Sequence, residues 1–184
     1  MSAVALEEIV LADDMIVQFL KTVKNHGPSS AYVAAGSVRN LVWDKRYGRV
    51  PDYRAADVDV VYFDTSDRSR ESESRYEKAL TTIAPGHDWQ VRNQARMHVP
   101  AGDPPYKNMA DALSHWPETA TAVAARLDTQ GGLELVTPFG PGDLMGHVLR
   151  PTPAIMARDV GIFRARVQQK RWLERWPDLE VLEA

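Results

Sequence analysis

The chain has 184 residues, a net charge of −3 and no cysteine. This length allows one domain with a hydrophobic core, and the slight acid excess argues against a dedicated nucleic-acid-binding protein, which usually carries a basic surface. The absence of cysteine excludes disulfides and zinc–thiolate sites, and because no apolar run is long enough to span a membrane and the acidic N-terminus is not typical of a signal peptide, we expect a cytoplasmic protein.

Hydrophobic periodicity predicts helices and strands that alternate along most of the chain. The predicted elements, in chain order, are helix 7–25, strand 32–35, helix 38–47, strand 58–63, helix 65–83, strand 89–98, loop 99–105, helix 109–113, strands 119–127 and 133–136, and helices 143–147 and 154–176. This order predicts an α/β fold in which a mixed central sheet is flanked by helices. With no repeat or linker, residues 1–184 are expected to form a single domain, with a core at about 5–150 and a C-terminal helix at about 154–176.

Two acids, Asp57 and Asp59, alternate with aliphatic residues at the start of one predicted strand. Side chains at i and i+2 share a face of a strand, so the two carboxylates repel each other unless a cation lies between them. Mg²⁺ is a suitable cation because it prefers oxygen ligands and a phosphate partner. The other interpretation is the solvent face of an edge strand, but Val58, Val60 and Val61 indicate a central strand whose acidic face lines a cleft.

Gly36-Ser37 follows the strand at 32–35 and begins the next predicted helix. The first turn of a helix has free backbone N–H groups that can bind a phosphate, although a lone glycine can also be a simple turn residue. Combined with the acid pair, this turn predicts a metal-assisted site for phosphoryl or nucleotidyl transfer. Mg²⁺ or Mn²⁺ is the expected cofactor and a nucleoside triphosphate the expected substrate.

Several other charged residues are candidates for this site or for the surface. Arg39 lies in the first turn of a helix, where the helix dipole disfavours a cation. One interpretation is that it pairs with a carboxylate such as Asp57 or Asp59, or with a phosphate; the other is that it is a surface arginine. Arg92, Arg96 and His98 share one face of the predicted strand 89–98, where the arginines could neutralise a triphosphate or form an exposed basic face. The remaining predictions are a helix-surface position for Asp44, a helix cap at Asp64, and a solvated charged face over residues 68–78.

Gly36-Ser37-Val38-Arg39-Asn40 followed by Asp57-Val58-Asp59 resembles the signature of polymerase-β-type nucleotidyltransferases. The resemblance is greatest to the head domain of CCA-adding enzymes and bacterial poly(A) polymerases, and to a small family of bacterial nucleotidyltransferase-like proteins that consist of little more than that head domain. It covers about residues 5–165, in four blocks at 35–44, 57–64, 93–98 and 117–122.

The resemblance implies that Asp57 and Asp59 bind the catalytic Mg²⁺ ions and that Gly36 and Ser37 contact the triphosphate. Residues implied or predicted to complete the nucleotide site are Arg39, Arg92, Arg96 and Glu118, the last of which matches the acid of the CCA-type Arg-Arg-Asp segment.

Three departures from the family pattern leave parts of this assignment open. Pro117 replaces the arginine before the Arg-Arg-Asp acid, and Ala122 replaces an asparagine, which leaves CCA-type ribose recognition undecided. The strand after the acid pair also lacks the third acid that many of these enzymes carry. Glu118 or Glu134 could substitute for it, or the site could bind nucleotide without efficient turnover.

The sequence therefore predicts a Mg²⁺-dependent transfer of a nucleoside monophosphate from an NTP to an unknown acceptor. The chain has about forty residues after Asp143-Leu144 and an acid excess, so we expect a small-molecule or protein acceptor rather than tRNA, and no nucleic-acid binding without a partner protein. The alternative is a catalytically silent module, antitoxin-like, that binds a nucleotide or a partner protein.

Overall fold

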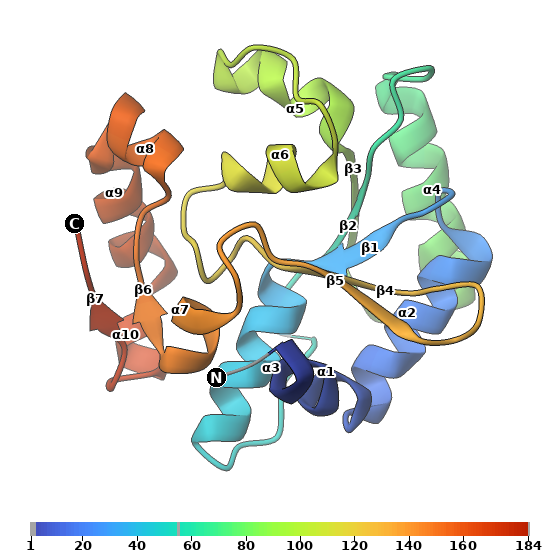
Figure 1. The fold of residues 1–184 in the computed structure, drawn as a ribbon. Coiled ribbons are helices and arrows are strands. Elements are labelled where there is room, and N and C mark those ends of the chain that lie inside the picture. The colour runs from blue at the N-terminus through green and yellow to red at the C-terminus, as the bar shows by residue number, and fades with distance from the viewer. Residues whose placement is uncertain (1–2, 55, 184) are drawn as a thin grey trace.

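The computed structural model describes residues 3–54 and 56–183. Within them, five strands form a mixed sheet in the order β3-β2-β1-β4-β5 (Figure 1). Only β2 and β3 run parallel, and the other neighbours pair antiparallel. The strands are β1 (Tyr32–Ala34), β2 (Val58–Tyr62), β3 (Trp89–Asn93), β4 (Ala124–Leu127) and β5 (Leu133–Val136), and a separate parallel pair consists of β6 (Val148–Leu149) and β7 (Glu180–Val181). The predicted mixed sheet is therefore confirmed.

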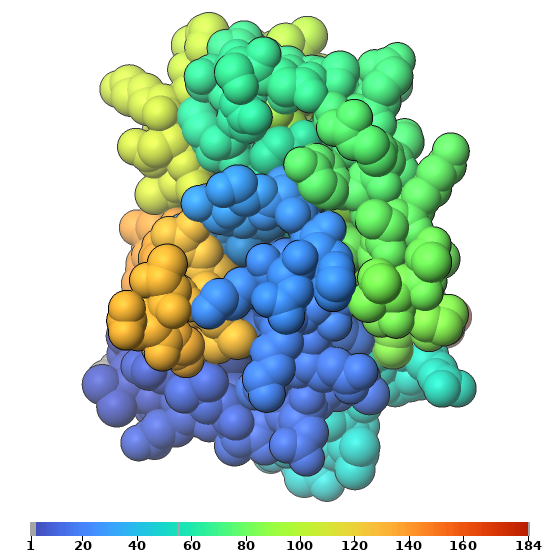
Figure 2. All heavy atoms as spheres, turned by 90° about the vertical axis from the view of Figure 1, so that its right-hand side faces the viewer, coloured from blue at the N-terminus to red at the C-terminus, as the bar shows by residue number. Residues whose placement is uncertain are grey.

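Helices surround this sheet on several sides (Figure 1). They are α1 (Ala3–Leu11), α2 (Asp14–His26), α3 (Gly36–Arg46), α4 (Arg70–Ile83), α5 (Gln94–Ala101), α6 (Met109–Ser114), α7 (Gly142–Gly146), α8 (Pro153–Arg158), α9 (Val160–Lys170) and α10 (Trp172–Arg175). In the view of Figure 1, α5 and α6 lie above the sheet, α1 and α3 below it, and α8 to α10 to the left. Figure 2 shows the side formed by α2, α4 and the β4–β5 hairpin. None of the helices described here is long and apolar enough to cross a membrane.

The two faces of the sheet contribute to different hydrophobic clusters. Val33, Val58 and Val60 pack with residues of α1 to α4 in the main core. Their neighbours along the strands point the other way, so Ala34 and Val61 pack with α6 in a second, smaller cluster. This second face is the one on which strand alternation places Asp59.

The outer edge of β3 is covered by two glutamates of α4. Glu77 accepts a hydrogen bond from the backbone N–H of Val91 at 3.0 Å, and Glu73 accepts one from that of Asn93 at 2.7 Å. The glutamates are four residues apart on one helix face, and the amides are two apart on the strand, so the two spacings match. The predicted solvated face over residues 68–78 is therefore wrong at Glu73, which is buried.

Three predicted elements begin or end elsewhere because a side chain caps a helix. The helix predicted over 7–25 is two helices, since Asp13 accepts a hydrogen bond from the backbone N–H of Ile16 and begins α2. The strand predicted over 89–98 stops at Asn93, whose side chain caps α5, so Arg96 and His98 are helical and the predicted loop over 99–105 begins only after Ala101. The helix predicted from 65 begins at Arg70 with Ser69 as its cap, and the prediction of Asp64 as the cap is wrong.

The C-terminal segment is more broken than predicted. The helix predicted over 154–176 consists of α8, α9 and α10, because Asp159 caps α9 and Arg171 has a left-handed conformation with φ 51°. The strand predicted from 119 begins only at Ala124, after a turn in which the carbonyl of Glu118 accepts hydrogen bonds from the N–H groups of Thr121 and Ala122. The predicted strand at 133–136 and the helices near 109–113 and 143–147 are present.

Candidate active site

The acid pair lies at the start of β2, on the sheet face opposite the main core. Asp57 immediately precedes the strand, and Asp59 is paired in register with Ala34 of β1 and Gln90 of β3. Both acids are partly buried. Burial and the neighbouring charge of Asp57 raise the pKa of Asp59 to about 6, against the opposing effect of nearby cations. The position between two neighbouring strands confirms that β2 is a central strand and not an edge.

The turn between β1 and α3 lies beside this acid pair. Ala35 precedes α3 with φ 50° and ψ −120°, a conformation that disfavours any residue with a side chain. No side chain caps α3, and its first intrahelical bond joins the N–H of Arg39 to the carbonyl of Ala35. The N–H groups of Gly36, Ser37 and Val38 therefore precede the helical ladder and are available for an anion.

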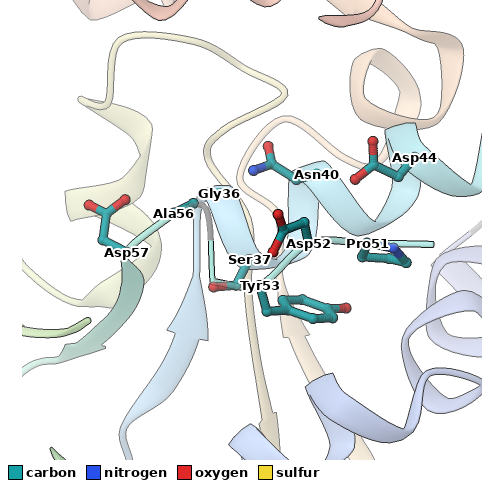
Figure 3. Close-up of a pocket in the computed structure, with 9 residues that line it drawn as sticks. All are labelled: Gly36, Ser37, Asn40, Asp44, Pro51, Asp52, Tyr53, Ala56 and Asp57. Carbon is teal, nitrogen blue, oxygen red and sulfur yellow. The ribbon is translucent and has the colours of Figure 1, made fainter. Parts of the chain in front are cut away.

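Figure 3 shows the pocket around this turn, with Asp57 on one side of Gly36 and Asn40 and Asp44 on the other. A Cβ atom at Gly36 would have Arg39 Nη2 at 3.7 Å and Asn40 Nδ2 at 3.8 Å as its nearest neighbours, which are ordinary contacts. The fold itself thus tolerates a side chain at position 36. A requirement for glycine there would come from a ligand that approaches the backbone.

Arg39 is buried behind the turn, and its interpretation as a surface residue is wrong. Its guanidinium donates hydrogen bonds to Thr121 Oγ1 at 2.8 Å and to Asn40 Oδ1 at 2.9 Å, and its central carbon lies 4.6 Å from the ring centre of Trp172 and 5.2 Å from that of Trp43. Burial lowers the pKa of Arg39 to about 10, opposed first by the charge of Glu118. Asp59 and Asp57 also interact with this charge, so Arg39 is an electrostatic neighbour of the acid pair.

Glu118 is fully buried and is bound by the C-terminal segment. The Nε atom of Arg166 in α9 donates to Glu118 Oε1 at 2.6 Å. Arg166 also lies 5.9 Å from the ring of Trp172, the tryptophan that contacts Arg39. Glu118, Arg166, Trp172 and Arg39 therefore form one connected group of side chains. Through it, α9 and α10 contact the first turn of α3.

The two arginines predicted to neutralise a triphosphate are each bound by a carboxylate of α4. Arg92 pairs with Glu77 at 2.5 Å, and Arg96 forms a two-pronged pair with Glu73 at 2.5 and 2.7 Å. The prediction that both share a strand face with His98 is wrong, because Arg96 and His98 are in α5. Arg92 is still close enough to lower the pKa of Asp59, and the predicted nucleotide contacts of both arginines stay predictions.

The chemistry of the donors fits Mg²⁺. Two carboxylates on one strand face offer the hard oxygen ligands that this ion prefers, and phosphate and water oxygens usually complete its shell. Across the described ranges, no three histidine or acidic side chains are grouped closely enough to form a complete metal site. Glu118 is bound to Arg166, and Glu134 accepts hydrogen bonds from Tyr32 and Arg126, so neither joins the acid pair as a third carboxylate.

Sequence reasoning missed the role of several residues in this region. Asp44 is not a surface acid: its exposed fraction is 1%, and it accepts hydrogen bonds from Arg175 at 2.6 Å and from the indole N–H of Trp176 at 2.9 Å. Nothing in the sequence indicated that Trp172 and Thr121 contact Arg39, or that Lys170 interacts with Asp59. One signal was available in the sequence, because the spacing of four residues between Trp172 and Trp176 is typical of one buried helix face, and both side chains are buried.

Comparisons with known proteins agree with this geometry. A model of a nucleotidyltransferase family matches residues 21–181. An NMR structure described as revealing a CCA-adding enzyme head domain is 30% identical, with a TM-score of 0.85, and the match covers 97% of this chain and 95% of that one. The comparison with curated proteins gives no match.

Complete CCA-adding enzymes share the fold at lower identity. A complex with ATP is 18% identical with a TM-score of 0.59, and the Thermotoga maritima CCA-adding enzyme complexed with tRNA is 18% identical with a TM-score of 0.62. Each match covers 97% of this chain but only 42% of the larger enzyme. From the family match and the head-domain structure together, we conclude that the chain belongs to the nucleotidyltransferase family and has the fold of a CCA-adding enzyme head domain.

Proposed function

We propose that the protein is a Mg²⁺-dependent nucleotidyltransferase that moves a nucleoside monophosphate from an NTP to an acceptor hydroxyl. The observation that carries this proposal is the position of Asp57 and Asp59 beside the uncapped start of α3. One group supplies oxygen ligands for a metal, and the other supplies backbone N–H donors for phosphate. The family membership supports this combination.

The residues divide the chemistry as follows. Asp57 and Asp59 would hold Mg²⁺, which when bound would neutralise phosphate charge and favour attack by the acceptor oxygen. Gly36 and Ser37 would bind the triphosphate through their backbone N–H groups. The acceptor oxygen bonds to the α-phosphorus, the bond to the β-bridging oxygen breaks, pyrophosphate leaves with the electron pair, and the hydroxyl proton passes to water.

Arg39 and Glu118 would act from behind the turn. Arg39 is enclosed by Trp172 and Trp43 and bonded to Asn40, so it holds the first turn of α3 in place while its charge offsets that of the acids. Because Asp44 binds Arg175 and Trp176, the C-terminal segment is attached to the same helix. We therefore propose that residues 1–184 function as one domain.

We propose a small molecule or a protein as the acceptor in place of tRNA. The basic side chains of the C-terminal helices could have formed a phosphate-binding face, but most of them pair with carboxylates. The pairs are Arg158–Asp103, Arg164–Glu183, Arg166–Glu118, Arg171–Glu174 and Arg175–Asp44. Since counterion release by free cations supplies most non-specific affinity for nucleic acid, we expect no binding of bulk tRNA tighter than roughly 10⁻⁴–10⁻⁶ M at physiological salt.

One observation favours a second function, a nucleotide-binding module without turnover. Gln90 is paired in register with Asp59 on β3, the strand on which the family resemblance leads us to expect a third acid. An amide oxygen is a weaker ligand than a carboxylate because it carries no charge. A site with two carboxylates could bind a Mg²⁺–NTP complex and fail to activate an acceptor.

Calorimetric titration with ATP, CTP, GTP and UTP, with and without Mg²⁺, tests the proposal, followed by an assay for released pyrophosphate. We expect Mg²⁺-dependent binding that Asp57→Asn abolishes. Asp88→Asn is the matched control, since Asp88 is an exposed aspartate that immediately precedes β3 as Asp57 precedes β2. Binding without pyrophosphate release would favour the silent module, and equal binding by Asp57→Asn and wild type would refute the metal assignment.

A further inference from the structure

One basic residue of the described helices α8 to α10 has a side chain that forms no ion pair. Five arginines from Arg158 to Arg175 form the ion pairs given above. Lys170, the last residue of α9, is exposed, and within residues 3–54 and 56–183 its side chain makes no ion pair or hydrogen bond. An unpaired lysine on a surface is common, so its position decides whether it has a role.

Lys170 is the last residue of α9, at the end of the helix that leads into α10. It is one helical turn after Arg166, so the two side chains project from the same side of α9, and Arg166 reaches Glu118 at 2.6 Å. Two residues later, Trp172 contacts the guanidinium of Arg39 at 4.6 Å. Arg166 before Lys170 and Trp172 after it therefore contact Glu118 and Arg39, the two charged residues buried behind the turn. Lys170 itself interacts electrostatically with Asp59.

The other cations near Asp59 are already engaged. Arg92 pairs with Glu77, and Arg39 is buried between tryptophans with bonds to Thr121 and Asn40. A nucleoside triphosphate brings more negative charge than one Mg²⁺ ion neutralises, and the two aspartates add to it. The exposed ammonium of Lys170, on its flexible four-carbon side chain, is suited to the phosphates that Mg²⁺ leaves exposed.

We propose that Lys170 binds the β- and γ-phosphates of the NTP and remains bound to the pyrophosphate as it leaves. This inference rests on the proposed nucleotidyl transfer. It gives α9 a direct part in the site, because the Arg166–Glu118 pair holds the helix in place and Lys170 extends from its last turn. The sequence predicted that Arg92 and Arg96 neutralise the triphosphate, but both pair with glutamates. In this proposal Lys170, whose side chain has no carboxylate ion-pair partner in the described residues, has that role.

The test compares Lys170→Gln and Lys170→Arg with wild type by calorimetry. The probes are Mg²⁺–NTP, the matching nucleoside monophosphate and inorganic tripolyphosphate. Arg164→Gln is the matched control, because it removes an exposed charge from the same helix but one that pairs with Glu183. We expect Lys170→Gln to bind NTP and tripolyphosphate about 10- to 100-fold more weakly, as for the loss of a charge-assisted hydrogen bond, with the monophosphate unchanged.

Lys170→Arg should restore most of the affinity, since it keeps the charge. Equal loss of monophosphate affinity in Lys170→Gln would show a general structural effect and overturn the inference. Wild-type affinity of Lys170→Gln for NTP would overturn it as well, while leaving the proposed function intact. Wild-type protein that binds none of the NTPs would overturn the proposed function, and this inference with it.

Discussion

Asp59→Asn should stabilise the metal-free protein at neutral and alkaline pH. The folded protein holds Asp59 with a pKa of about 6, against about 3.9 for an unperturbed aspartate, because burial and Asp57 disfavour its charged form. The charged carboxylate therefore opposes folding. Since one pKa unit corresponds to about 1.4 kcal/mol, the shift of about two units sets an upper limit of about 3 kcal/mol on the gain, and we expect about 1–3 kcal/mol because Asp59 is only partly buried.

The pH dependence gives this prediction its sign. The folded state holds the Asp59 proton more tightly than the unfolded state, so the group stabilises the fold at low pH and this contribution is lost as pH rises through about 4 to 6. The asparagine side chain of the variant cannot ionise. The stability difference between variant and wild type should therefore be near zero below about pH 4 and reach its full value above about pH 7.

Urea unfolding of both proteins in EDTA across this pH range measures the difference directly. Adding Mg²⁺ should stabilise wild type and leave Asp59→Asn unchanged. The difference in unfolding free energy between the two proteins should therefore become smaller or change sign. A variant that is less stable than wild type at pH 8, or a difference that does not change with pH, would refute the argument that the acid pair is under electrostatic strain.

Three further predictions concern the framework of the site. Ala35→Gly should raise stability by about 1 kcal/mol, because glycine relieves the strain at φ 50° and ψ −120°; a lower melting temperature would contradict it. Asp44→Ala should cost about 1–3 kcal/mol in urea unfolding, since it leaves the buried indole N–H of Trp176 without an acceptor while Arg175 stays partly solvated; no measurable loss would show that the C-terminal segment is not anchored there. Burial lowers the pKa of His147, so stability should decline as pH falls below about 6.5, and His147→Asn, which suits the left-handed backbone, should lack that part of the slope.

Local patterns predicted most of the sheet because its strands are short, apolar and bounded by turn residues. The errors arose where one side chain ends an element. Asn93 continues the alternation of β3 and at the same time caps α5, so the end of the strand was not predicted. Pro100 lies near the end of α5, and because proline is typical of loops, residues 99–101 were predicted as part of a loop. Arg171 divides α9 from α10 through a left-handed conformation for which an arginine gives no signal.

The turn and the acid pair could be predicted because each is contiguous in sequence. The group that supports them could not, since its contacts join residues far apart in the chain. Arg39 meets Thr121 across 82 positions, and Asp44 meets Arg175 across 131. A single sequence carries no information about such pairs, and only the folded chain shows that Asp44 and Glu118 are buried partners of the C-terminal arginines.

The contact of Arg39 with two indole rings has an optical consequence. The ring centres of Trp172 and Trp176 lie 6.3 and 5.0 Å, respectively, from that of Trp43, and the guanidinium of Arg39 lies over the rings of Trp43 and Trp172. Tryptophan emission responds to nearby charge, so an anion that reaches the start of α3 would change the intrinsic fluorescence of the protein. The chain thus carries its own reporter of ligand binding at the site, one that needs no label and no knowledge of the acceptor.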